Sequence, residues 1–236
     1  MDSKIIKIFI FLLIFFSNQN LSAVEFKGEF KQGSFILGKT EPDSNVSIDK
    51  KKVRVSKDGY FAFGLGRDRK NDVVIRVFKD GKLEVFEKKV FKREYKIQKI
   101  DGLAKKHVTP PPEVYERIKK DNILIGKARS IDTDYDFFKD KFIYPVDKYI
   151  ITGVYGSQRI LNGKPRRPHY GIDFHAPEGV VVKAMMDGEV TLAEKDMYFT
   201  GGTIIFDHGH GISTLFMHMK DINVKVGQKI KQGQIV

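Results

Sequence analysis

The chain has 236 residues, enough for one large or two ordinary domains, and 41% of them are hydrophobic, which is sufficient for a folded core. It is basic, with a formal net charge of +12, but its lysines are spread along the chain and no aromatic–basic nucleic-acid motif accompanies them. These features exclude a disordered chain and give no reason to expect a nucleic-acid partner. Because cysteine is absent, disulfides and a lipoprotein attachment thiol are excluded as well.

Residues 1–23 have the pattern of an export signal peptide. Lys4 and Lys7 precede an apolar run at residues 8–16, and Ala23 ends a polar stretch that fits a cleavage site. The apolar run is shorter than the about 20 residues that cross a bilayer, which favours cleavage over the alternative, an uncleaved signal anchor. The segment therefore predicts an exported protein of the periplasm or cell envelope.

Residues 24–100 are predicted to form a small all-β module. Apolar and polar residues alternate in short segments, and Gly59 and Gly81 each follow an aspartate, a pair typical of hairpin turns. The expected strands include residues 53–55, 73–78 and 83–90. The pattern favours a β-sandwich of immunoglobulin-like type. Since the module has no histidine and no compact acid cluster, an interaction or spacer role is favoured over catalysis.

Residues 101–141 are predicted to be a linker followed by one helix. Pro110, Pro111 and Pro112 exclude regular strand pairing and stiffen the path of the chain. After them, residues 113–129 carry apolar side chains at helical spacing, which predicts an amphipathic helix. Its polar side is mixed in charge, so a face buried against a neighbouring element is favoured over a membrane-surface role.

Residues 142–236 are predicted to form a second all-β domain, because strand patterns and glycines return and helical periodicity is absent. The expected strands are residues 149–155, 180–185, 189–193, 203–207, 213–218 and 224–226. Residues 182–190 and 224–234 repeat one pattern, strand, glycine turn, strand, which indicates two related hairpins.

Five of the six histidines lie between His169 and His218, and His169 stands four residues before Asp173. Imidazole and carboxylate together suit zinc, so the cluster predicts a metal site. In a smooth strand the two side chains would share a face but lie about 13 Å apart. The backbone must therefore curl between them, and Gly171 permits bulged or positive-φ geometry because it has no Cβ. A surface ion pair is the alternative for an isolated His-x-x-x-Asp.

Four blocks in this region resemble, in the right order, lysostaphin- or LytM-type zinc endopeptidases, which cut the peptide cross-bridges of bacterial peptidoglycan. The blocks are Tyr-Gly-Ser-Gln-Arg at residues 155–159, His-Tyr-Gly-Ile-Asp at 169–173, the glycine-flanked stretch 201–209 and Thr-Leu-Phe-Met-His at 214–218. The resemblance extends over residues 142–236. It implies a duplicated-hybrid-motif fold, which is a barrel-sandwich of repeated hairpins. It also implies an enzyme in which water attacks a peptide bond.

The resemblance also implies roles for three residues. His169 and Asp173 correspond to zinc ligands, and His218 corresponds to a catalytic histidine that activates the attacking water or steadies the oxyanion. Zn²⁺ is the implied cofactor, and peptidoglycan cross-bridges are the implied partner. Peripheral contact with anionic envelope surfaces is left open, and the oligomeric state is undetermined.

The other histidines of the cluster receive no catalytic role. His175 is expected to be solvated, and His208 and His210 flank a glycine in a composition that predicts a turn. Arg159, Arg166 and Arg167 are candidates to pair with carboxylates of wall peptides, although an exposed arginine is more often only solvated.

The family supplies its third zinc ligand from a His-x-His motif beyond the second repeat, and no such motif follows His218. The expectation is a copy of an exported zinc metalloendopeptidase that is truncated before this motif. Such a fragment should be poorly active, because two ligands hold zinc weakly.

Two alternatives stay open. A degenerate LytM-domain regulator would activate a separate cell-wall amidase, although His169, Asp173 and His218 are all retained. A lipoyl- or biotinyl-type carrier module is the second alternative, because residues 226–234 resemble the hairpins of such domains; no lysine occupies the turn at Gly188 that such a carrier would modify.

Overall fold

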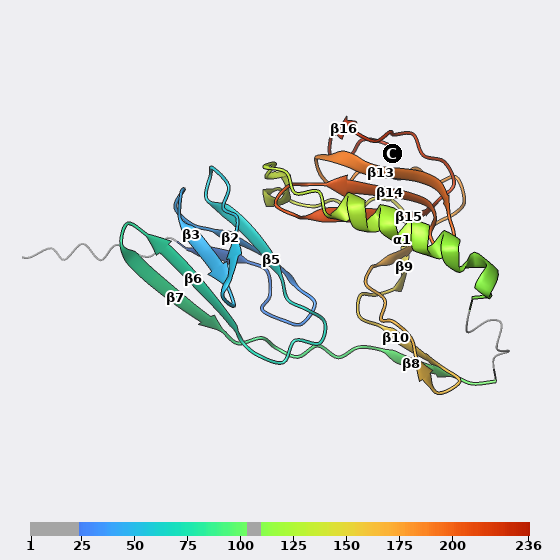
Figure 1. The fold of residues 1–236 in the computed structure, drawn as a ribbon, viewed down its shortest axis with the longest axis horizontal. Helices are drawn as coiled ribbons and strands as arrows, with labels where there is room; N and C mark the ends of the chain where they lie inside the picture. The colour runs from blue at the N-terminus through green and yellow to red at the C-terminus, as the bar shows by residue number, and fades with distance from the viewer. Residues whose placement is uncertain (1–23, 103–109) are drawn as a thin grey trace, which may run out of the picture.

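The computed structural model describes residues 24–102 and 110–236, coloured in Figure 1. The predicted signal peptide at residues 1–23 and linker residues 103–109 lie outside this range. Strands dominate the described chain and α1 (Tyr115–Arg129) is its only α-helix, so the predicted all-β class is confirmed. No helix in the described part has the length and apolar character needed to cross a membrane.

Two antiparallel sheets form the amino-terminal module. Their strand orders are β1-β2-β5 and β4-β3-β6-β7. The strands are β1 (Glu25–Lys27), β2 (Phe35–Lys39), β3 (Asn45–Ile48), β4 (Lys51–Val53), β5 (Tyr60–Gly64), β6 (Val73–Lys79) and β7 (Lys82–Lys88). Alternate side chains of both sheets enter one core, where Ile36, Phe61 and Ile75 are fully buried. The alternation seen in the sequence thus produces two layers around a shared interior.

The two Asp-Gly turns of this module differ in what they connect. Asp80 and Gly81, with φ of 47° and 78°, join β6 to β7 as the predicted hairpin. Gly59, with φ of 85°, instead lies between β4 and β5, which belong to different sheets. A Cβ on Gly59 would lie 1.9 Å from the Thr40 carbonyl oxygen, so the crossing requires glycine. The strand expected at residues 53–55 ends at residue 53 because the chain turns toward the second sheet.

The segment after the sandwich joins the carboxy-terminal region through a strand. β8 (Ile97–Ile100) pairs in parallel with β10 (Gln158–Leu161), which pairs antiparallel with β11 (Lys164–Pro165). Figure 1 shows this small sheet apart from both larger β structures. The chain therefore contributes a strand beside the His169 region before the helix begins.

The predicted helix is confirmed, with the short 3-10 turn η2 (Pro112–Val114) leading into α1. The helix lies across β13 (Gly188–Met197) and β14 (Gly201–Asp207), as Figure 1 shows. Ala128 of the helix is buried in a small core with Leu192 and Ile205, and Ile125 packs against it. One face of α1 thus covers the sheet, as the amphipathic pattern predicts.

A four-stranded sheet of order β15-β14-β13-β16 forms the centre of the carboxy-terminal region, and a two-stranded sheet joins β12 to β9. The remaining strands are β9 (Ile150–Gly153), β12 (Asp173–His175), β15 (Ser213–Met219) and β16 (Lys229–Ile230); η3 (Phe137–Lys139) is a short 3-10 turn. Ile204 and Phe206 of β14 are fully buried at its core.

Two expected strands are absent among the described residues of this region, those at 180–185 and 224–226. The first forms only an isolated antiparallel bridge, Lys183 to Ile235, and no continuous strand. The two repeated segments instead pair with each other. Gly188 lies opposite Ile230, and the Ala184 amide donates to the Gln234 carbonyl at 2.8 Å.

Candidate metal centre and groove

His169 and Asp173 meet, as the sequence predicts. The Nε2 atom of His169 lies 3.0 Å from Oδ1 of Asp173. The chain bends at Gly171, and the pairing of β12 with β9 shifts register directly after Asp173. Gly171 is not among the residues with positive φ, so the bend and the bulge together produce the predicted curl.

Three contacts with backbone groups hold His169, one through its imidazole and two through its own backbone. Its Nδ1 lies 3.3 Å from the Val154 carbonyl oxygen, an acceptor that suits a proton on Nδ1, the tautomer in which Nε2 could bind a metal ion. The His169 amide donates to the Ser157 carbonyl at 2.8 Å, and the His169 carbonyl accepts from the Gly156 amide at 2.7 Å. The loop at residues 154–157 thus fixes both the ring and the backbone of His169.

Gly153 makes room for the carboxylate of Asp173, and the sequence analysis missed this residue. The two residues are paired between β9 and β12, and a Cβ on Gly153 would lie 2.1 Å from Oδ2 of Asp173. The sequence signal that could have identified Gly153 is a glycine inside an otherwise apolar strand pattern. Such a glycine often marks a place where another group approaches the strand backbone closely.

His218 lies in an irregular part of β15. Its φ is 62°, and the register of β14 against β15 shifts between Gly202 and Ile204, opposite this segment. The His218 amide donates to the Thr200 carbonyl at 2.8 Å. Such bulges re-aim side chains, and here the exposed imidazole of His218 borders the same groove as His169 and Asp173.

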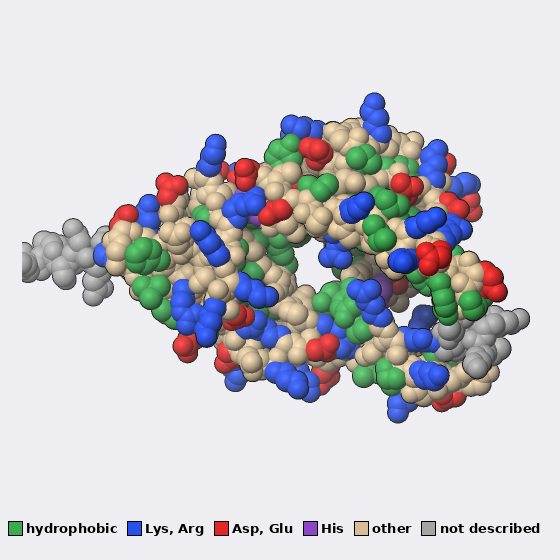
Figure 2. Space-filling model, viewed as in Figure 1, with side chains coloured by type: hydrophobic (Ala, Val, Ile, Leu, Met, Phe, Trp, Pro, Cys, Tyr) green, Lys and Arg blue, Asp and Glu red, His purple; other side chains and the backbone are tan. Residues whose placement is uncertain are grey.

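This groove has a volume of about 2730 Å³ and brings all three predicted site residues to one surface. Its borders also include Ile97 of β8 and Ile118 of α1, so the linker strand and the helix contribute to it. Figure 2 shows the surface hollowed between the two parts of the molecule, with a histidine visible at the back. Lysines and arginines are scattered over this face rather than gathered in one patch.

His208 is buried, and both of its ring nitrogens have partners. Nδ1 lies 2.6 Å from the Asp187 carbonyl oxygen, and Nε2 lies 2.8 Å from Oγ1 of Thr214. Burial lowers the pKa of His208 and also that of His210, so burial favours the neutral form of both rings. His210 lies in the predicted turn with φ of 52°. The geometry of His208 is that of a structural histidine.

The chemistry of the His169–Asp173 pair suits a metal ion. Two ligands that each lie about 2.0 to 2.1 Å from a tetrahedral zinc are about 3.3 Å apart. The observed separation of 3.0 Å is a few tenths of an ångström shorter. A carbonyl oxygen beside Nδ1 is also the usual companion of a metal-binding histidine. Within residues 24–102 and 110–236, no group of three or more His, Cys, Asp or Glu side chains gathers around one point, so this pair would supply two ligands at most.

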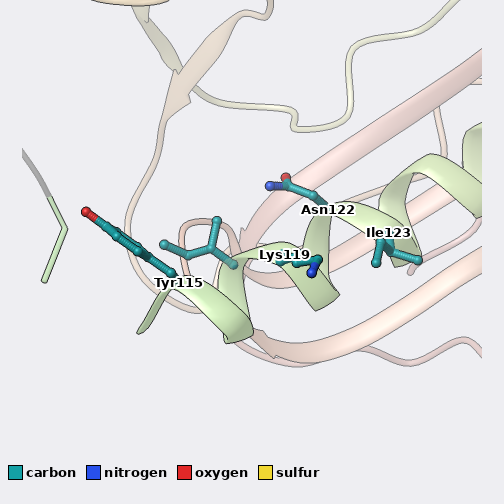
Figure 3. Close-up of a pocket in the computed structure, with 5 residues that line it drawn as sticks. Tyr115, Lys119, Asn122 and Ile123 are labelled. Atoms are coloured by element: carbon teal, nitrogen blue, oxygen red, sulfur yellow. The ribbon is translucent and has the colours of Figure 1, made fainter. Parts of the chain in front are cut away.

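A second depression lies on α1 alone, and Figure 3 shows its lining side chains. It is bordered by Tyr115, Ile118, Lys119, Asn122 and Ile123. These residues include no carboxylate or imidazole, so the depression lacks the acid–base pair that a hydrolytic centre needs.

The fold and the groove together define a β-rich domain with a histidine and an aspartate side by side in its groove. Residues 167–236 match the model of Peptidase family M23, which confirms the predicted resemblance for this region. A crystal structure from Pseudomonas aeruginosa, described as a peptidase M23, shares the fold with a TM-score of 0.64 and 22% identity, covering 88% of this chain and 82% of that chain.

Curated relatives match parts of the chain. Peptidoglycan DD-endopeptidase ShyA of Vibrio cholerae is 36% identical over 93 residues, which are 39% of this chain and 21% of ShyA. Cell division protein DipM of Caulobacter vibrioides is 29% identical over 129 residues, covering 54% of this chain and 19% of DipM. Lysostaphin of Staphylococcus simulans is 38% identical over 69 residues, covering 29% of this chain and 14% of lysostaphin. The chain therefore spans a fifth or less of the length of DipM and lysostaphin and about a fifth of ShyA.

Proposed function

We propose that the carboxy-terminal region is a zinc-dependent endopeptidase that hydrolyses peptide cross-links of bacterial peptidoglycan. The observation that carries this proposal is the approach of His169 Nε2 and Asp173 Oδ1 to 3.0 Å in a groove that also exposes His218. The M23 match supports the reaction class. The names of ShyA and lysostaphin support a peptide of the bacterial cell wall as the substrate.

His169 and Asp173 would hold the metal ion, and the Val154 carbonyl would keep the imidazole of His169 in the required tautomer. Zinc supplies a Lewis acid that polarises a carbonyl and lowers the pKa of bound water toward about 7. His218 would act as a general acid–base group or donate a hydrogen bond to the developing oxyanion. Its exposure in the groove gives the substrate access to it.

Substrate binding would use the borders of the groove. Arg159 and Arg167 are exposed there, and guanidinium groups pair with carboxylates such as those of cross-link peptides. The guanidinium of Arg167 lies 5.3 Å from the ring centre of Tyr170, which limits its freedom. The signal pattern at residues 1–23 supports export to the periplasm or cell envelope, where this substrate occurs.

The test is zinc content and cross-link digestion by the purified full-length protein and four variants. His169→Ala and Asp173→Ala should lose both bound zinc and digestion of purified muropeptides. His218→Ala should keep zinc while its digestion rate falls about 10² to 10⁴-fold, the range for loss of a general acid–base group. His175→Ala is the matched control, because His175 lies on the same strand β12 and borders the same groove. The His175→Ala variant should keep both its bound zinc and its digestion of muropeptides.

Full-length protein that binds no zinc and releases no muropeptide fragments would overturn the proposal. If that protein instead stimulated a cell-wall amidase, the regulator alternative would replace it. Digestion that survives His169→Ala would overturn the residue assignment.

A further inference from the structure

The amino-terminal module touches the loop that holds His169. Nε of Arg67 donates to the Gly156 carbonyl oxygen at 2.8 Å, across 89 positions of sequence. The amide of the same glycine donates to the His169 carbonyl at 2.7 Å. A single residue, Gly156, therefore connects a side chain of the sandwich module to the backbone of the predicted metal ligand.

The contact is tightly packed on the loop side. Gly156 is buried with φ of 88°, and a Cβ on it would lie 2.0 Å from Cε1 of Tyr95. A Cβ on Gly33 would likewise lie 2.6 Å from Cε1 of Tyr155. Because side chains at either glycine would collide with these rings, the loop at residues 154–157 and the module fit together in one arrangement.

Contacts within the amino-terminal module hold the Arg67 side chain in place. This side chain is only 9% exposed, and its guanidinium lies 4.3 Å from the centre of the Tyr95 ring. The Tyr95 hydroxyl donates to the Arg67 carbonyl at 3.1 Å. Burial raises the pKa of Tyr95, which keeps this donor protonated. The donor to Gly156 is therefore oriented by the module itself.

We propose that Arg67, oriented by Tyr95, is a positioning residue of the metal centre. It fixes the loop at residues 154–157, and the loop fixes the backbone and ring of His169. The inference rests on the proposed function, because it assigns the amino-terminal module a part in holding the zinc ligand. The module is then a structural component of the active site and not a spacer alone.

A second set of contacts holds the module at a different place. Arg54 pairs with Asp132 at 2.6 Å and Asp134 at 3.0 Å, and Lys139 pairs with Asp58 at 2.9 Å. Removing the Arg67 side chain therefore leaves the module attached through these pairs. This separation makes the effect of Arg67 on His169 measurable without detaching the module.

The experiment compares Arg67→Met with Arg69→Met in the full-length protein. Arg69 stands two residues away, but its guanidinium contacts Asp49 at 2.6 Å and the Asp72 carbonyl at 2.6 Å, all within the module. Two quantities are measured: amide hydrogen exchange of Gly156 and His169 without metal, and the zinc dissociation constant by competition with a chelator.

In Arg67→Met, exchange at Gly156 and His169 should rise about three- to tenfold, as expected from the loss of one hydrogen bond. Zinc affinity should fall about 10- to 100-fold, the usual effect of losing a residue that orients a metal ligand. Arg67→Lys, which keeps one donor for the Gly156 carbonyl, should recover part of both losses. Arg69→Met should change neither quantity, although it weakens the module.

A folded Arg67→Met protein with unchanged exchange at these amides, or with unchanged zinc affinity, would overturn the inference. So would an equal effect of Arg69→Met, because that would reflect general loss of stability. The exchange measurement needs neither zinc nor cleavage. If the unaltered protein digests no peptidoglycan, the proposed function fails while the exchange data still decide the positioning of His169.

Discussion

Asp173 reaches His169 because Gly153 has no side chain. The strand geometry at Gly153 does not require a positive φ, so alanine can adopt the backbone there, but its Cβ would occupy the position of Oδ2. The carboxylate is the end of a flexible side chain and would move. The absence of a side chain at Gly153 on β9 therefore allows the two predicted ligands to converge.

Gly153→Ala should lower zinc affinity about 10- to 100-fold with little change in the free energy of unfolding. The physical reason is displacement of the Asp173 carboxylate from its 3.0 Å approach to His169. Chelator competition measures the affinity, and urea unfolding measures the stability. Gly64→Ala is the control, because a Cβ there meets nothing within 4 Å. Unchanged zinc affinity in Gly153→Ala would show that the carboxylate does not bind the ion.

His218 has a backbone conformation that favours glycine. With φ of 62° it lies in the left-handed region, which costs an ordinary residue about 1 to 2 kcal/mol. We expect His218→Gly to be more stable than His218→Ala by about 1 kcal/mol, while both variants lose digestion. Urea unfolding midpoints check the first expectation. If the alanine variant were equally stable, the backbone at residue 218 would not be strained.

At the scale of elements, burial in the turn after β14 favours the neutral form of His208 and His210. His208 is enclosed between the Asp187 carbonyl and Thr214, and burial is the main cause of its lowered pKa, opposed by the hydrogen bond to Asp187 and by the charges of Asp207 and Asp187. The pKa of His210 is lowered for the same main reason. The turn that connects β14 to β15 thus contains two histidines whose protonation is disfavoured by burial.

Stability should therefore decrease in acid. The unfolded chain takes up protons at these two histidines near pH 6.5, whereas the folded chain does so only at lower pH. Their contribution to stability is complete above pH 6.5 and declines as pH falls from there toward the folded-state pKa values. The urea midpoint should be lower at about pH 5.5 than at about pH 7.5. His208→Gln should show a smaller difference between the two conditions; an identical difference would remove His208 as a cause.

At the scale of the whole molecule, the hydrophobic core of the amino-terminal module is separate from the two core clusters of the carboxy-terminal region. The first draws its residues from the amino-terminal module, and the others draw theirs from α1 and the carboxy-terminal sheet. The contacts between the two parts include ion pairs such as Arg54 with Asp132, and exposed ion pairs contribute at most about 1 kcal/mol each. They also include ring contacts such as Phe35 with Phe142 and the pairing of β8 with β10. The contacts that position His169 thus join two parts whose stability comes from different cores.

Heating should produce two unfolding transitions in scanning calorimetry, because separate cores unfold as separate cooperative units when the contacts between them are weak. Arg54→Ala should leave both transition temperatures nearly unchanged. A single transition would contradict this expectation, because it would mean that the module and the carboxy-terminal region unfold as one cooperative unit.

Much of this arrangement could be predicted from local patterns. Alternation predicted β6, β14 and β15 to within two residues, and apolar spacing predicted α1. The four-residue separation of His169 and Asp173, with glycine between them, predicted their convergence. These predictions succeeded because strand alternation, helix periodicity and short-range chain geometry depend on residues that are close in sequence.

The sequence by itself determined the two β-rich parts, the helix between them and the blocks that carry His169, Asp173 and His218. Only the tertiary structure decided that residues 180–185 form a single bridge instead of a strand, that β8 joins β10, and that Arg67 reaches Gly156 across 89 positions. Each of these outcomes depends on which surfaces meet after the elements form. Contacts between distant residues follow from packing and loop closure, which no local pattern of side chains encodes.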